Sequence, residues 1–166
     1  MLVIERGIMS AGKDMRYEHL IQVNDPDDAA IIPLTRLQLW HGLVARAEDP
    51  VGFVYGLDAM RIRARGRGFI ERELHFGTRI IRDRVEFVEV ESVRYDIESS
   101  PEFPASHLLI HIEEPRPSHL FLRFSYASVT QEEGADYEDY IKQAYFEADM
   151  DSVSRILMLA ASGMLD

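Results

Sequence analysis

The feature that most limits how this chain can fold is a run of six predicted strands between residues 57 and 128, joined by very short separators. The segments are short, rich in strand-forming residues and bounded by turn signals, which is typical of strands. The strands span residues 58–65, 69–76, 79–88, 92–98, 107–113 and 119–127. Parallel strands need a crossover of roughly a dozen residues or more, and separators such as Gly77-Thr78 leave no room for one. This part of the chain is therefore expected to form an antiparallel meander.

Clear start and stop signals mark a helix ahead of this meander. Thr35 and Gln38 have the spacing of a capping box, in which each side chain bonds to the backbone N–H of the other residue. Leu34 and Leu39 occupy the two positions of a hydrophobic staple. The Glu-Asp-Pro sequence at residues 48–50 is expected to end the helix.

A long helical pattern closes the chain over residues 135–162. Its apolar positions recur at the i, i+3, i+4 spacing of one helix face. They are Ile141, Ala144, Tyr145, Ala148, Ser152, Ile156, Leu159 and Ala160. With a first strand at 17–23 and a short helical turn at 51–55, the order of elements is β-α-(α)-β-β-β-β-β-β-α.

This order predicts an α+β fold with a seven-stranded antiparallel sheet. One face of such a sheet needs an apolar cover, and the closing helix is the only element long enough to provide it. We expect a single domain over residues 15–166, preceded by a flexible extension over residues 1–14.

The composition narrows the classes of function. The 29 acidic and 18 basic residues give a net charge of −11, which argues against binding to nucleic acid or to anionic membranes. No apolar stretch is long enough to insert into a membrane. Without cysteine the chain has no disulfide, no thiolate nucleophile and no cysteine-based zinc site. We expect an acidic cytoplasmic domain, with a homodimer left open as the commonest oligomer.

Charged residues indicate the register of the first two strands of the meander. A three-residue loop at 66–68 places Arg63 opposite Glu71 and Arg61 opposite Glu73, as exposed ion pairs on the outer face. A slip of one residue would set apolar side chains against charged ones. The alternate residues of the same strands then face the closing helix.

In this register Arg72 lies on the inner face of the sheet. The turn at 77–78 places Asp83 directly opposite Arg72, also facing inward. A buried guanidinium needs a partner, because an unpaired buried charge is strongly destabilising. Two interpretations stay open. Arg72 is either a structural residue, paired with Asp83 or reaching solvent at the rim of the sheet, or a polar anchor for a ligand carboxylate or carbonyl in an apolar cavity.

Several aromatic residues also face the predicted interior. Tyr95 and Tyr126 fall on inner faces of the sheet, and Tyr137 and Tyr145 approach from the closing helix, either as core residues or as parts of a cavity wall. His19 points inward, and we expect a core histidine rather than a general base, because the sequence shows no nearby carboxylate. The candidate ligand-binding residues are Arg72, Asp83, Tyr95, Tyr126, Tyr145 and His19.

We expect no metal and no cofactor, and we assign no catalytic residue. His107, His111, Glu113 and His119 form the densest histidine region. Residues four apart on a strand lie about 13 Å from each other, which is too far for both to bind one ion. The sequence also lacks the Gly-x-Ser-x-Gly pattern of a hydrolase nucleophile.

Five stretches carry a family resemblance. They are Tyr17-Glu-His-Leu-Ile-Gln-Val-Asn-Asp25, Leu34-Thr-Arg-Leu-Gln-Leu-Trp-His-Gly-Leu-Val44, Arg46-Ala-Glu-Asp-Pro50, Arg72-Glu-Leu-His-Phe-Gly77 and Lys142-Gln-Ala-Tyr145. With them the chain resembles the AtaL-like family of the START-like superfamily, also called SRPBCC or the birch-pollen-allergen fold, over about residues 15–166. The resemblance implies a helix-grip fold, in which a curved sheet holds the C-terminal helix and leaves a cavity between them. It also implies binding or transfer of an apolar ligand, or cyclase or dehydratase chemistry on polyketide-like substrates.

Three functions follow from these observations. The favoured one is binding of a small hydrophobic or polyketide-like molecule between sheet and closing helix. The alternative is a cyclase or dehydratase that uses Arg72, Asp83, Tyr95 or Tyr126 for proton transfer or oxyanion stabilisation. The third is a protein-binding module with a filled core. A strongly shifted pKa within reach of a cavity would favour the enzyme, a cavity alone the binding protein, and a solid core with a large apolar patch the module.

Overall fold

The computed structural model describes residues 13–101, 103–130 and 135–166. The strands are β1 (Lys13–Asn24), β2 (Ala59–Gly66), β3 (Phe69–Phe76), β4 (Arg79–Val88), β5 (Ser92–Ile97), β6 (Ser106–Arg116) and β7 (His119–Thr130). The helices are α1 (Arg36–Glu48), the short 3-10 helix η1 (Pro50–Gly52) and α2 (Ala135–Ala161). The order of elements is the expected one. The predicted extension at residues 1–14 lies almost entirely outside the described residues.

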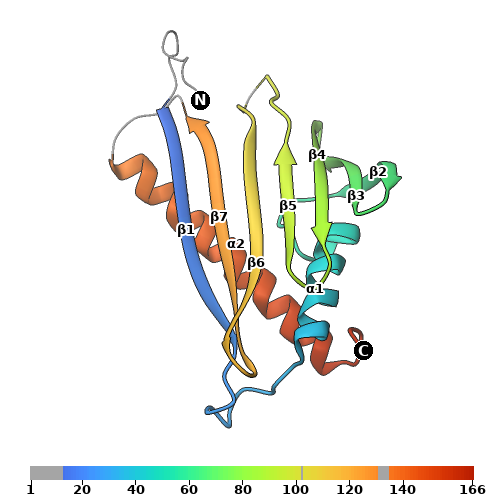
Figure 1. The fold of residues 1–166 in the computed structure, drawn as a ribbon. Helices are drawn as coiled ribbons and strands as arrows, with labels where there is room; N and C mark the ends of the chain where they lie inside the picture. The colour runs from blue at the N-terminus through green and yellow to red at the C-terminus, as the bar shows by residue number, and fades with distance from the viewer. Residues whose placement is uncertain (1–12, 102, 131–134) are drawn as a thin grey trace.

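The seven strands form one antiparallel sheet in the order β1-β7-β6-β5-β4-β3-β2. The meander from β2 to β7 follows the chain order, and β1 joins it by pairing with β7. The long helix α2 runs diagonally across one face of this sheet, with α1 near its C-terminal end (Figure 1). The predicted α+β architecture is therefore confirmed. In the described part of the chain, neither helix is both long enough and apolar enough to cross a membrane.

Helix α1 begins with the predicted capping box. The Thr35 hydroxyl oxygen accepts the backbone N–H of Gln38 at 3.0 Å, and the Gln38 side-chain oxygen accepts the backbone N–H of Thr35 at 2.8 Å. Leu34 and Leu39, the two staple residues, are both buried. The second helical turn is shorter than predicted and consists of η1 alone.

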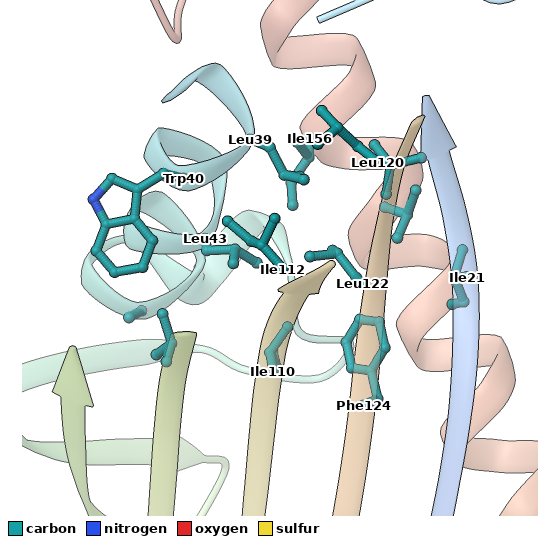
Figure 2. Close-up of a cluster of buried hydrophobic side chains, with 14 of the residues drawn as sticks. Ile21, Leu39, Trp40, Leu43, Ile110, Ile112, Leu120, Leu122, Phe124 and Ile156 are labelled. Atoms are coloured by element: carbon teal, nitrogen blue, oxygen red, sulfur yellow. The ribbon is translucent and has the colours of Figure 1, made fainter. Parts of the chain in front are cut away.

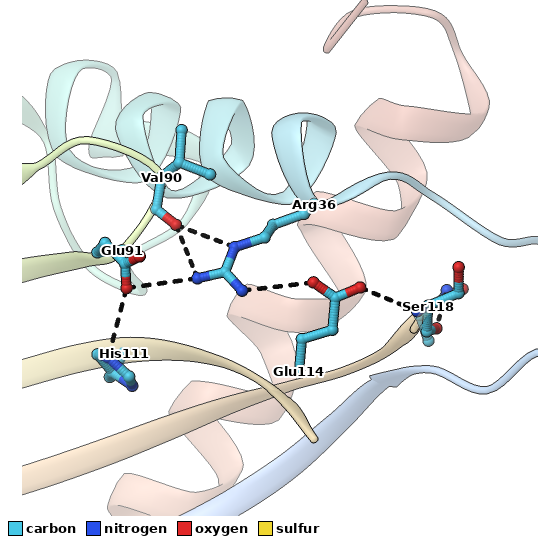
Figure 3. A network of polar contacts seen from close by, with 7 residues as sticks. Arg36, Val90, Glu91, His111, Glu114 and Ser118 are labelled. Atoms are coloured by element: carbon cyan, nitrogen blue, oxygen red, sulfur yellow. Dashed lines mark hydrogen bonds and ion pairs between the residues drawn. The ribbon is translucent and has the colours of Figure 1, made fainter. Parts of the chain in front are cut away.

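A further contact fixes where α1 lies against the sheet. Arg36 donates from Nε and Nη2 to the backbone carbonyl oxygen of Val90, at 3.1 and 3.0 Å. Val90 lies in the turn between β4 and β5 with a φ of 62°, an unusual conformation for a β-branched residue. Glu91 and Glu114 lie on two sides of the same guanidinium (Figure 3). Arg36 therefore holds a strained turn against the start of the helix.

The register between β3 and β4 is the predicted one, with Arg72 opposite Asp83 and Leu74 opposite Ile81. The expected pair of Arg63 and Glu71 is wrong. The ladder between β2 and β3 shifts at Arg63, so that Ala64 lies opposite Glu71. An extra residue of this kind is a β-bulge, and it removes one side chain from the pairing.

The outer face of the sheet carries ion pairs, and one of their carboxylates, Glu73, is buried rather than exposed. Glu73 is 6% exposed, because three side chains surround it. Its carboxylate lies 3.3 Å from Arg61, 3.1 Å from Arg82 and 3.0 Å from His75. These neighbours hold the pKa of Glu73 below its usual value, against the opposing effect of burial.

Helix α2 turns most of the predicted stripe inward. Ser152 and Ile156 are buried, and the half-buried members of the stripe are Ile141, Tyr145, Leu159 and Ala160. Ala144 and Ala148 are exposed, so the prediction is wrong at these two positions. The fully buried Asp149 lies on the inner face as well, which the prediction missed because a search for apolar residues leaves a carboxylate out.

The hydrophobic core fills only one end of the space between sheet and helices. Figure 2 shows Leu39, Leu43, Ile112, Leu122 and Ile156 meeting where α1, α2, β6 and β7 converge. Gly42 makes this close approach possible, because a Cβ atom there would lie 2.7 Å from a methyl carbon of Ile156. The other end of the interior is not filled by side chains.

Candidate functional site

A cavity of about 700 Å³ lies between the sheet and the N-terminal half of α2. Its lining includes Met15 near the start of β1, Ser128 near the end of β7, and Phe103 in the loop between β5 and β6. Its apolar wall includes Leu74, Ile81, Leu108 and Ile141. Four of the six candidate residues also line it: Arg72, Asp83, Tyr95 and Tyr145.

Arg72 and Asp83 form a closed pair in the wall of this cavity. They are 4% and 3% exposed. Arg72 donates from Nε to Asp83 Oδ1 at 2.9 Å and from Nη2 to Asp83 Oδ2 at 2.6 Å. Its Nη1 donates to the backbone carbonyl oxygen of Ala47 in α1 at 2.8 Å. Each guanidinium nitrogen thus has a protein partner, which favours the structural interpretation of Arg72.

A second arginine at the cavity was not among the predicted residues. Arg46 lies near the end of α1 and donates from Nε to Ser152 Oγ in α2 at 3.2 Å. The hydroxyl of Tyr95 lies within hydrogen-bond reach of its guanidinium, and no carboxylate of the described chain forms an ion pair with it. Burial alone would lower the pKa of Arg46, but Tyr95, Tyr126 and the Asp149 carboxylate together raise it.

Both cavity arginines contact the ring of Tyr95, which lines the cavity with them. Tyr95 is 3% exposed, and the guanidinium carbons of Arg46 and Arg72 lie 5.0 and 5.2 Å from the centre of its ring. These are cation–π distances. The hydroxyl of Tyr95 is buried and has no well-aligned hydrogen bond among the described residues, although it lies within hydrogen-bond reach of Arg46 and raises the pKa of that arginine.

The remaining two candidate residues, Tyr126 and His19, lie behind the cavity wall around Asp149. Asp149 is fully buried. The Tyr126 hydroxyl donates to its two carboxylate oxygens at 2.8 and 2.7 Å. His19 Nε2 lies 2.8 Å from Asp149 Oδ2. The geometry at the ring nitrogen is not that of a hydrogen bond, so this contact is electrostatic. The expectation that His19 has no carboxylate nearby is therefore wrong.

Burial dominates the ionisation of this cluster. It raises the pKa of Asp149 to about 7, although the hydrogen bond from Tyr126 and the charge of Arg46 both act in the opposite direction. Burial and the neighbouring Asp149 raise the pKa of Tyr126, and burial lowers the pKa of His19. Near neutral pH the cluster therefore exchanges a proton at Asp149.

An aromatic stack joins this buried cluster to the cavity. The rings of Tyr126 and Tyr145 are parallel within 3° with their centres 3.9 Å apart. Tyr17 stacks beside both at 6.4 Å. Since Tyr145 lines the cavity and Tyr126 contacts Asp149, the stack separates the carboxylate from the cavity interior.

Arg46 and Asp149 were not among the predicted site residues, although their spacing from apolar neighbours places both on inward helix faces. Arg46 follows Leu39 by seven positions and Leu43 by three, which places it on the buried face of α1. Asp149 follows Tyr145 by four positions and precedes Ser152 by three on α2. A polar residue in the middle of an apolar stripe is the signal that would have identified both.

The predicted histidine region divides into separate surface contacts. His107 pairs with Asp96 at 2.5 Å, and His111 lies 3.9 Å from Glu91. His119 lies near Asp25 and Asp27, with one ligand atom of each within 4.8 Å of the others. An ion pair of 3.3 Å between His119 and Asp27 accounts for this group.

Comparison with known proteins identifies the family. A family model described as acetylaranotin biosynthesis cluster protein L, AtaL, matches residues 21–163. The chain belongs to the AtaL family. A search of curated protein sequences found no match to this AtaL-family chain.

Solved structures share the fold of the AtaL-family chain at low sequence identity. It is similar to the Zhui aromatase/cyclase from Streptomyces sp. R1128, with a TM-score of 0.63 and 14% identity over 90% of this chain and 94% of that one. It is also similar to the di-domain aromatase/cyclase StfQ of the steffimycin biosynthetic pathway, with a TM-score of 0.66 and 11% identity over 87% of this chain and 50% of that one. Ara h 8.0201 matches with a TM-score of 0.62 and 10% identity over 88% and 99% of the two chains. The fold is therefore START-like, as the sequence resemblance implied.

Proposed function

We propose that this chain binds a small, largely apolar molecule of the polyketide-like or flat aromatic class in the cavity between the sheet and α2. The observation that carries the proposal is a cavity of about 700 Å³ with apolar walls and polar side chains gathered at its inner end. Sites for small molecules typically measure 300–1,000 Å³ and combine apolar walls with a few placed polar groups.

The cavity also argues against a module with a filled core. A well-packed interior contains few voids larger than a water molecule. Here the α1 end of the interior is close-packed, whereas the other end is open over many side chains. Two of the similar structures are aromatase/cyclases, which favours a polyketide-like occupant over other apolar molecules.

Blocking the cavity tests this proposal. Ser128 lines it from β7, so Ser128→Trp would place an indole inside. Ser154→Trp, on the exposed face of α2, is the matched control. Titration of 2-acetylanthracene, followed by its fluorescence, is expected to give the same Kd for wild type and control, and a Kd at least tenfold higher for Ser128→Trp. Equal binding by all three chains, or no binding to the wild type by any of a panel of flat aromatic ketones, would overturn the proposal.

A second candidate function is a cyclase or dehydratase, and Asp149 is the observation that favours it. A carboxyl group whose pKa lies near 7 is suited to general acid and base catalysis at neutral pH. Neither Asp149 nor its hydrogen-bond donor Tyr126 lines the cavity, however, so no direct path for a proton in the described chain joins Asp149 to a bound molecule. This is the reason why we place binding first.

Product analysis distinguishes the two candidates. An enzyme is expected to convert a linear poly-β-ketone thioester into a cyclised product that has lost water, detected by mass spectrometry. Asp149→Asn would abolish that conversion and leave the Kd of 2-acetylanthracene unchanged. An unchanged substrate after prolonged incubation, together with tight binding, would exclude the cyclase or dehydratase candidate.

We further propose that the chain acts in the cytoplasm with the small molecule as its partner. The absence of cysteine fits a compartment in which disulfides do not form, and the net charge of −11 disfavours nucleic acid. A homodimer is the common default among oligomers. Light scattering during size-exclusion chromatography would measure a mass of one or two chains.

A further inference from the structure

We propose that Arg46 binds an anionic group of the ligand, a carboxylate or an enolate, so that the ligand is an acidic apolar molecule rather than a neutral lipid or hydrocarbon. This inference rests on the proposed function and adds to it the chemical class of the ligand and the end at which it is held. It also assigns the role of polar anchor to a residue other than Arg72.

The contrast between the two cavity arginines carries the argument. Arg72 is neutralised by Asp83 through two hydrogen bonds and donates a third to Ala47. Arg46 contacts two uncharged hydroxyls, those of Ser152 and Tyr95, and no carboxylate pairs with it among the described residues. A guanidinium has five N–H donors in a planar fork that matches a carboxylate. Most donors of Arg46 are therefore left for a ligand.

Among the charged residues of the cavity wall, Arg46 is the one at this end without an ion pair to a described residue. Asp83 forms an ion pair with Arg72. The other charged residues of the cavity wall, Glu98 and Arg79, are exposed. Asp149 acts on Arg46 through space but forms no ion pair with it. Because Arg46 is half-buried in an apolar cavity and has no ion pair in the described chain, an anionic group of a ligand would be favoured beside it.

Tyr95 adds a second group to the same subsite. Its ring lies 5.0 Å from the Arg46 guanidinium carbon and holds the fork in place by a cation–π contact. Its hydroxyl has no aligned partner among the described residues and is free to donate. An oxyanion next to Arg46 would satisfy unused donors from two elements, α1 and β5.

Two probes of the same shape separate charge from apolar fit. Anthracene-2-carboxylate and 2-acetylanthracene differ in that a charged oxygen replaces a methyl group. The wild type is expected to bind the carboxylate at least tenfold more tightly than the ketone, as charge-assisted hydrogen bonds require. Arg46→Met is expected to remove this preference. It would raise the Kd of the carboxylate about tenfold or more and change the Kd of the ketone less than about twofold.

Arg63→Met is the matched control, because it removes the same charge from an exposed position on the outer face. It is expected to keep the preference of the wild type. Arg46→Lys keeps the charge but loses the planar fork of donors. It is therefore expected to raise the Kd of the carboxylate several-fold and to leave the Kd of the ketone unchanged. This variant also serves as the test if Arg46→Met fails to fold, which circular dichroism would show.

Each outcome separates this inference from the proposed function. Arg46 would be shown to be structural if the wild type bound the two probes with equal affinity, or if Arg46→Met lost the same affinity for both. The proposed binding of small molecules in the cavity would stand in either case. Failure of both probes to bind the wild type would overturn the proposed function, and this inference with it.

Discussion

Arg72 and Asp83 lie directly opposite each other in the ladder between β3 and β4. Two hydrogen bonds of 2.9 and 2.6 Å join their side chains on the inner face of the sheet. The third bond, to the Ala47 carbonyl oxygen, ties the pair to the end of α1. The same pair therefore fixes the register of a hairpin and the position of the helix that carries Arg46. Its disruption is expected to act on stability first.

Removing one member of this pair leaves a buried charge without a partner. We expect Arg72→Met and Asp83→Leu each to lower the free energy of unfolding by about 3–5 kcal/mol. The double variant is expected to cost clearly less than the sum of the two, because no charge then remains buried. Urea denaturation of the four chains measures the cycle, and strict additivity would show that the two residues do not act as a pair.

The buried Asp149 makes stability depend on pH. Its pKa is about 7 in the folded chain and 3.8 as the ordinary value, so between these values the folded state keeps a proton that the unfolded state has lost. The free energy of unfolding should therefore fall as the pH rises from 5 to 8, by about 2–3 kcal/mol, and then level off. Urea denaturation at a series of pH values measures this slope.

The control for this slope is Asp149→Asn, which keeps an oxygen for Tyr126 and has no proton to lose. His19 acts in the opposite sense, because its lowered pKa costs stability as the pH falls below about 6.5. Because His19 Nε2 lies 2.8 Å from the Asp149 carboxylate, the variant also alters His19, so the comparison with Asp149→Asn is made between pH 6.5 and 8. A wild type and a variant with the same pH profile would show that Asp149 is ionised throughout.

Gly42 provides a test of the packing between the two helices. Gly42→Ala should lower the free energy of unfolding by about 1–3 kcal/mol, because its Cβ would stand 2.7 Å from Ile156. Gly52→Ala is the comparison, since its nearest neighbour, at 3.0 Å, is the end of the flexible Arg155 side chain. A smaller loss is expected there. Thermal unfolding of the two variants measures the difference, and equal losses would contradict this view of the helix contact.

The sheet could be predicted because its register depends on local features. A two-residue turn and strict alternation fix which residues face each other, and Arg72 with Asp83 follows directly. The bulge at Arg63 could not be predicted, since one inserted residue leaves the alternation on both sides intact.

The site was harder to predict, because its main residues break the apolar pattern that locates a core. Arg46 and Asp149 are charged residues on buried helix faces, and a search for apolar stripes omits them. The cavity itself depends on how side chains from several strands and α2 fill one volume. No periodicity along the chain contains that information.

The most direct test of the central claim, that the cavity holds a small molecule, is native mass spectrometry of the chain purified from its own host. We expect a noncovalent adduct of one small molecule on the wild type, and none on Ser128→Trp, whose indole takes up the same space. An adduct of equal abundance on both chains would contradict the account. So would the absence of any adduct combined with no rise in Tm across a library of lipids and aromatic polyketides.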